Sequence, residues 1–88
     1  MRKGETKSGF KFKIDEQNLN DMEFIENLAA AQSDALMFPK VIEQLLGKDQ
    51  KEKLYAHLRD KNGHVPVEAT VDAITEIMVL AGDDTKNS

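Results

Sequence analysis

Residues 38–47 decide the fold and read FPKVIEQLLG. Pro39 suits the first position of a helix, where its missing N–H removes no hydrogen bond. Two adjacent apolar pairs follow one helical turn apart, namely Val41, Ile42, Leu45 and Leu46. Such pairs make a wide apolar face, which is typical of the helix at the centre of a small bundle. Gly47 suits the left-handed backbone that ends many helices, so the stretch predicts a helix over residues 39–46 followed by a positive φ.

The sequence beyond this helix predicts two more. Asp49 and Glu52 stand three residues apart, as in a capping box, and predict a helix over residues 49–61 that an Asn-Gly pair ends. Pro66 again suits a first helical position, and apolar residues recur every three or four positions over residues 66–81. The side chains expected to share one buried core are Ile42, Leu45, Leu54, Leu58, Val71, Ile74 and Ile77.

The sequence before this helix predicts a further helix, over residues 20–32. Asn20 can cap its first turn, with Glu23 three residues later. One apolar stripe is expected to face the core, formed by Met22, Ile25, Leu28 and Ala29, with Phe24 beside it. Asp15 can begin a preliminary turn that carries Leu19.

Residues 10–14 read FKFKI and alternate apolar with basic side chains, which indicates a strand. No second alternating run exists in the chain, although the backbone of a strand needs hydrogen-bond partners. Three arrangements are compatible with the pattern: pairing with the same strand of another copy, addition to a partner's sheet, or extended packing against the chain's own helices. Residues 1–9 and 83–88 are polar and are expected to be flexible tails on a single domain over residues 10–82.

Composition sets the class of protein. A chain of 88 residues forms one domain with a modest core, and the absence of Cys excludes disulfides and thiolate metal sites. The net charge is −4, but residues 1–13 carry five basic residues against one acidic, whereas residues 14–47 carry one against seven. A basic head of this kind can solubilise the chain or dock on an acidic surface, such as the body of another copy. The expected fold is mainly α, a small bundle of about four helices with a short N-terminal extended or β segment.

No motif for catalysis or for a cofactor stands in the chain. His57 and His64 are seven residues apart across a helix end, whereas a helical metal pair needs a spacing of three or four. The serines lack a nucleophile-elbow context, and the isolated glycines make no phosphate-binding loop. We therefore expect no enzymatic activity, no metal and no cofactor. No apolar run has the length of a membrane span or of a signal peptide, so we expect a cytoplasmic protein without a membrane partner.

A DNA-binding regulator is the main alternative. Residues 39–46, a turn at Gly47 and residues 49–61 outline a helix-turn-helix, and lysines gather on the second of these helices. Acidic residues interleave with those lysines, and the body of the chain is acidic. Because affinity for DNA comes mainly from phosphate neutralisation, nucleic acid is the less favoured partner.

Four segments resemble a family of small phage proteins. They read TKSGFKF at residues 6–12, FPKVIEQLLG at residues 38–47, QKEKL at residues 50–54 and LRDKNGHVP at residues 58–66. They resemble small acidic helical proteins of phages and prophages of Gram-positive bacteria, in particular the tail assembly chaperones of long-tailed phages. The resemblance lies in the overall layout of these segments and includes no catalytic motif.

The resemblance implies a role in virion assembly. A tail assembly chaperone coats the tape measure protein and keeps it soluble until tail tube protein polymerises around it. It acts in the cytoplasm of the host bacterium and is absent from the mature virion. Such a coat needs an apolar contact strip and weak self-association. The residues expected to bind the partner are Phe10, Lys11, Phe12, Lys13 and Ile14, together with Met37, Phe38 and Tyr55. The last three can equally be core residues.

Overall fold

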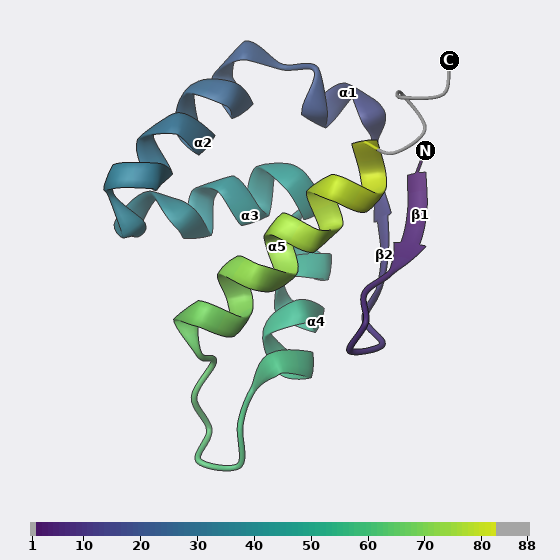
Figure 1. The fold of residues 1–88 in the computed structure, drawn as a ribbon, viewed down its shortest axis with the longest axis vertical. Helices are drawn as coiled ribbons and strands as arrows, with labels where there is room; N and C mark the ends of the chain where they lie inside the picture. The colour runs from purple at the N-terminus through teal and green to yellow at the C-terminus, as the bar shows by residue number, and fades with distance from the viewer. Residues whose placement is uncertain (1, 83–88) are drawn as a thin grey trace.

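The computed structural model describes residues 2–82 as a helical body with a small N-terminal sheet (Figure 1). Its elements follow one another as β1 (Arg2–Glu5), β2 (Lys11–Ile14), α1 (Glu16–Leu19), α2 (Met22–Ser33), η1 (Ala35–Met37), α3 (Phe38–Leu46), α4 (Lys48–Leu58) and α5 (Val67–Gly82). The mainly helical class with a short β segment is therefore confirmed. Each predicted helix has a counterpart whose ends differ from the prediction by no more than three residues. The tail predicted at residues 83–88 lies outside the described residues.

α3 lies at the centre of the fold, in contact with α2, α4 and β2 (Figure 1). Its large apolar side chains are all buried, namely Val41, Ile42, Leu45 and Leu46. The core joins them to Leu54 of α4 and to Ile74 and Ile77 of α5. The prediction was wrong for Leu58 and Val71, which are only partly buried. α4 ends at Leu58 instead of near residue 61, and Val71 lies on a side of α5 that faces a surface groove.

Gly47 joins α3 to α4 without an intervening loop. Its φ of 82° confirms the predicted positive value. Its ψ of 162° is not that of a left-handed helix, however, and this combination is open essentially to glycine alone. α4 begins at Lys48, so the predicted cap at Asp49 is wrong. The carbonyl oxygen of Gly47 itself accepts the hydrogen bond from the N–H of Lys51, with an N···O distance of 3.0 Å.

α2 presents a different face to the core from the one predicted. Phe24 and Ala31 are buried, whereas Met22 and Ile25 are exposed. Phe24, Leu28 and Ala31 are spaced four and three residues apart, so they share one side of the helix. The helix therefore carries two apolar stripes. It buries the one that contains the aromatic ring of Phe24.

The start of α2 also differs from the prediction. Asp21 caps it, and its Oδ1 atom accepts hydrogen bonds from the N–H groups of Glu23 and Phe24 at 2.7 and 3.3 Å. Asn20, the predicted cap, instead ends α1. The preliminary turn is confirmed as α1, whose cap Asp15 accepts from the N–H of Gln17 at 3.0 Å.

Residues 2–5 form a strand, so the flexible tail predicted over residues 1–9 is wrong for residues 2–9, and Met1 lies outside the described residues. β1 pairs with β2 in an antiparallel two-stranded sheet, with Gly4 opposite Phe12. The ring of Phe12 lies so close to Gly4 that a Cβ atom there would meet its Cζ atom at 2.5 Å. The ring thus fills the space that an apolar side chain on β1 would take. Because the inward positions of β1 carry Arg2 and Gly4, no alternating pattern marks this strand in the sequence.

A three-residue loop, Lys7 to Gly9, joins the two strands. The N–H of Thr6 donates to the carbonyl oxygen of Phe10 at 2.9 Å, and the N–H of Gly9 donates to the carbonyl oxygen of Thr6 at 2.9 Å. In three-residue hairpin loops the residue after the turn has a positive φ, and the φ of Gly9 is 96°. The N–H of Lys7 donates to the carboxylate of Glu76 on α5 at 2.7 Å, so the loop is attached to the helical body.

α5, the last helix, completes the core. It begins directly after Pro66, whose carbonyl oxygen accepts from the N–H of Thr70 at 3.1 Å and from its hydroxyl at 2.7 Å. Its C-terminal end lies beside the sheet, and it contacts β1 (Figure 1). None of the helices among residues 2–82 combines the length and the apolar character needed to cross a membrane.

Candidate functional site

The predicted binding strip at residues 10–14 does not offer an apolar face to a partner. Phe12 and Ile14 are only 3% and 1% exposed, and Phe10 is buried as well. The ring of Phe10 lies 5.7 Å from the ring of His57 on α4, measured between centroids. The protein's own helices cover this face of the sheet, as in the third arrangement that the sequence allowed. Phe10, Phe12 and Ile14 therefore belong to the core, and the prediction that they bind a partner is wrong.

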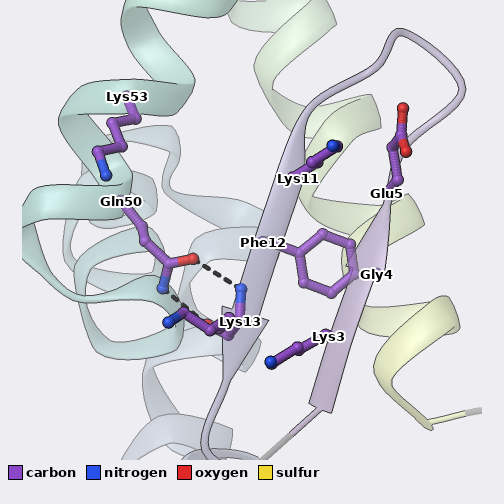
Figure 2. Close-up of a pocket in the computed structure, with 8 residues that line it drawn as sticks. All are labelled: Lys3, Gly4, Glu5, Lys11, Phe12, Lys13, Gln50 and Lys53. Atoms are coloured by element: carbon purple, nitrogen blue, oxygen red, sulfur yellow. Dashed lines mark hydrogen bonds between the residues drawn. The ribbon is translucent and has the colours of Figure 1, made fainter.

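Gln50 of α4 occupies the edge of β2 that β1 leaves open. Its side-chain oxygen accepts a hydrogen bond from the N–H of Lys13 at 2.7 Å, and its side-chain nitrogen donates to the carbonyl oxygen of Lys13 at 2.7 Å (Figure 2). The same nitrogen donates to the carbonyl oxygen of Leu46 at 2.7 Å. A side-chain amide that accepts and donates in this way imitates a neighbouring strand, so this edge is closed to another copy at Lys13.

The two predicted lysines lie in a basic surface on the outer face of the hairpin. Lys11 and Lys13, with Lys3 of β1 and Lys53 of α4, line an open hollow of about 570 Å³ (Figure 2). Glu5 is the acidic residue in this lining. Four ammonium groups around one hollow make a positive local potential, which attracts anionic groups more strongly at low salt than at high salt.

Two other predicted residues, Phe38 and Tyr55, share an apolar groove. It has a volume of about 360 Å³ and lies between the start of α3, α4 and the start of α5. Its wall also contains Leu36, Pro39, Ile42, Val65, Val67 and Val71. None of its lining residues carries a charge at neutral pH. Met37, Phe38 and Tyr55 are all partly buried and pack against the core. Phe38 and Tyr55 also line the groove, whereas Met37 does not.

Two strongly exposed apolar side chains belong to the groove, and the sequence reasoning missed both. Leu36 is 88% exposed and Val67 is 71% exposed. For Leu36 a signal was present, because four apolar residues stand in succession at residues 35–38 and a short connector cannot bury them all. Val67 gives no such signal, since its position in the helical period is also that of a core residue. A groove with apolar side chains exposed at its edge is the usual form of a site for another apolar chain.

One of the two histidines, His57, attaches a loop to the helical body. The Oγ atom of Ser8 lies 3.1 Å from Nε2 of His57, which connects the hairpin loop to α4. A catalytic Ser–His pair needs a third group that orients the imidazole, but His57 has the ring of Phe10 beside it. His64 lies exposed in the loop before α5. Among residues 2–82, no three His, Asp or Glu side chains come together as a metal site would require.

The first turns of α4 are engaged within the protein. The ammonium group of Lys51 pairs with the carboxylate of Glu43 on α3 at 2.9 Å. This hydrogen bond, together with the charge of Lys51, lowers the pKa of Glu43 below its usual value, and the same bond raises the pKa of Lys51. Gln50 holds β2. In a helix-turn-helix these positions would read bases, so such a use of α4 would require these contacts to break.

Comparisons with known proteins identify no relative of this chain. No protein family matches it, no curated protein matches it, and no solved structure matches it.

Proposed function

We propose that this protein is a non-catalytic tail assembly chaperone of a long-tailed phage or prophage, and that it binds helical segments of the tape measure protein in the apolar groove. The observation that carries the proposal is the groove itself, an uncharged surface in which Leu36 and Val67 are exposed to solvent. The resemblance of the four sequence segments supports the choice of partner. The acidic charge of the body supports its role as a solubilising coat.

The groove suits one face of an amphipathic helix. Such a helix places apolar side chains at spacings of three and four residues, and these enter a hydrophobic groove on the partner. A groove of about 360 Å³ holds few side chains, so each copy binds weakly. Many copies along one long helix give a stable coat through multivalency, and tail tube protein can still displace them one by one. The coat forms in the host cytoplasm and is lost before the virion is complete.

The test is co-expression with the tape measure protein encoded beside this chain's gene. The wild-type protein should keep the tape measure protein in the soluble fraction and co-purify with it. Leu36→Asp and Val67→Asp should each reduce the co-purified amount by about tenfold or more, because each buries an unpaired carboxylate in an apolar site. Both side chains are exposed in the free protein, so neither variant should unfold it.

Met22→Asp is the matched control. Met22 is 70% exposed, close to the value for Val67, but it lies on α2 outside the groove. This variant should bind like the wild type. If all three variants bound the tape measure protein equally well, the binding site would lie outside the groove. If wild-type protein leaves the tape measure protein insoluble, the chaperone function is wrong.

The basic surface favours one second candidate, a DNA-binding regulator of a prophage. Lys3, Lys11, Lys13 and Lys53 could neutralise phosphates from the hairpin face. A helix-turn-helix contact would instead require the hydrogen bonds of Gln50 and Lys51 to break. If each lysine met one phosphate, log affinity should fall against log salt with a slope of roughly −3 to −4. Titration of duplex DNA at several salt concentrations measures this slope. Absence of binding at low salt would exclude this candidate.

A further inference from the structure

The backbone groups of Lys3 and Glu5, on the outer edge of β1, have no hydrogen-bond partner among residues 2–82. In an antiparallel sheet, pairs that exchange hydrogen bonds alternate with pairs whose N–H and C=O groups point away from each other. The pair beside the loop, Thr6 and Phe10, is hydrogen-bonded. By this alternation Lys3 and Glu5 direct their backbone groups away from β2, and no hydrogen bond to these groups is found in the described part of the chain.

Both outer edges of the sheet carry backbone groups that point outwards, but the two edges differ in whether another residue binds these groups. Lys13 stands opposite Lys3, and its N–H and C=O groups also point outwards, where Gln50 binds both of them. β1 has no equivalent of Gln50 among the described residues. In Figure 1 it lies at the margin of the molecule, and α5 is the helix that contacts it. An edge left open in this way is a template for another strand.

We infer that β1 is a self-association surface, and that two copies join their β1 strands antiparallel around Gly4. Lys3 of each copy then exchanges a pair of backbone hydrogen bonds with Glu5 of the other. Gly4 stands opposite Gly4 between these pairs, at the position where antiparallel strands approach most closely and where side chains would crowd. The product is a four-stranded sheet in the order β2–β1–β1–β2.

The outward-pointing backbone groups allow several registers between the two β1 strands, and the side-chain charges favour the one centred on Gly4. A shift of two residues either way places Lys3 opposite Lys3 or Glu5 opposite Glu5 of the second copy, and like charges directly opposite are destabilising. The central register places Lys3 opposite Glu5 at both ends. Within its own sheet Lys3 stands opposite Lys13, so the second copy provides the acidic neighbour that its own sheet does not place there.

α5 supplies an apolar surface on the same side. Its Glu76 reaches the hairpin loop through the N–H of Lys7. Leu80 follows Glu76 by one helical turn and so lies on the same side of α5, with Val79 next to it, and both are exposed. A two-fold axis through the Gly4 pair places α5 of both copies under the same face of the joint sheet. Association of two copies therefore buries part of the exposed surface of Val79 and Leu80.

The interface is small, and the dimer is accordingly weak, with a dissociation constant on the order of 100 µM. Sedimentation equilibrium of the untagged full chain should show a change from monomer to dimer between about 10 µM and 1 mM, the range that brackets such a constant. Lys3→Pro should abolish the dimer. It removes an outward N–H that makes no bond within the hairpin, so the chain should still fold.

Charge reversal tests the register. Lys3→Glu and Glu5→Lys should each weaken the dimer by about tenfold or more, because each places like charges opposite each other. An equimolar mixture of the two variants should recover association, since opposite charges then face each other at both ends. Lys53→Glu is the matched control, because it makes the same change of charge away from the edge of β1 and should leave the dimer intact. The amide signals of Thr6 and Phe10 report whether the hairpin stays folded in each variant.

A chain that remains monomeric at about 1 mM, roughly ten times the expected constant, would overturn the inference. So would a dimer that is unaffected by both charge reversals, or a mixture that fails to recover. A dimer that survives Lys3→Glu but is lost in Leu36→Asp would assign self-association to the apolar groove instead. These measurements use the purified protein alone, so their outcome is independent of the proposed chaperone function.

Discussion

α3 and the N-terminal hairpin are both short, and both contact α4, but different interactions hold them in place. α3 lies between other elements and buries four large apolar side chains among them. The hairpin buries apolar side chains on one face only. A few polar contacts attach it to the helices, namely two hydrogen bonds to Gln50 and one contact each to His57 and Glu76. An element enclosed by apolar packing cannot move without leaving a cavity, whereas an element at the margin can open locally. Substitutions in the two regions should therefore differ in size.

The largest effect is expected at the centre of α3. Leu45 is fully buried, so Leu45→Ala should lower the free energy of unfolding by about 2–5 kcal/mol, the range for removing a large apolar side chain from a core. Urea denaturation followed by circular dichroism measures it. Leu36→Ala is the matched control at an exposed leucine and should change stability by less than about 0.5 kcal/mol. A loss below about 1 kcal/mol at Leu45 would mean that α3 is not the centre of the core.

The next effect is expected where α3 ends. Gly47→Ala should destabilise the protein by about 1–3 kcal/mol, because alanine strongly disfavours the backbone conformation at this position. A Cβ atom here would meet nothing within 4 Å, so any loss measures backbone strain and not a clash. Gly82→Ala is a suitable control, since Gly82 lies at the end of α5 without a positive φ. Equal effects of the two substitutions would contradict the strain at Gly47.

A substitution in the hairpin should lower the free energy of unfolding less than the substitutions in and after α3. A Cβ atom on Gly4 would overlap the ring of Phe12, but alanine also stiffens the strand, so Gly4→Ala should cost about 1–2 kcal/mol in total. Hydrogen exchange at the amide of Thr6 should rise more than exchange in α3, because the hairpin opens first. In a Phe12→Leu background the same change should cost less, since the Cζ atom is gone. An unchanged cost in that background would show that the ring does not restrict Gly4.

The same contrast explains how much of the fold could be predicted. The apolar pairs of α3 are a local pattern, and they predicted its ends to within one residue and its burial completely. β1 depends on the ring of Phe12 and on helices far along the chain, so its own four residues show no pattern. The loop did carry a signal, because Gly9 follows a turn and precedes the strand. On α2, two apolar stripes were possible, and the one that contains Phe24 is buried.

The site was predictable only in part. Phe38 and Tyr55 were expected to bind a partner, and they do meet in one groove. Lys11 and Lys13 were expected beside an apolar strip, but the strip is core and the lysines join Lys3 and Lys53 on the outer face. Apolar periodicity indicates which side chains share a face, but not which face other elements cover. Exposure of Val67 is therefore a property of the assembled fold, whereas the apolar run at residues 35–38 already carried a signal for Leu36.

The smallest effect is expected at the surface contact between α3 and α4. The hydrogen bond from Lys51, and after it the charge of Lys51, lowers the pKa of Glu43 from its usual 4.5. A carboxyl group whose pKa is lower in the folded state stabilises the fold above its unfolded pKa, and this contribution is lost as the pH falls through the folded value. Lys51→Met keeps the aliphatic stem and removes the charge, so the pKa of Glu43 should rise towards 4.5, as an NMR titration of its carboxyl carbon would show. Lys48→Met should shift this pKa less, because the attraction of Lys48 is the weakest of the causes. If both substitutions shifted the pKa of Glu43 equally, the long-range charge of α4 and not the hydrogen bond between the two helices would control this carboxyl group.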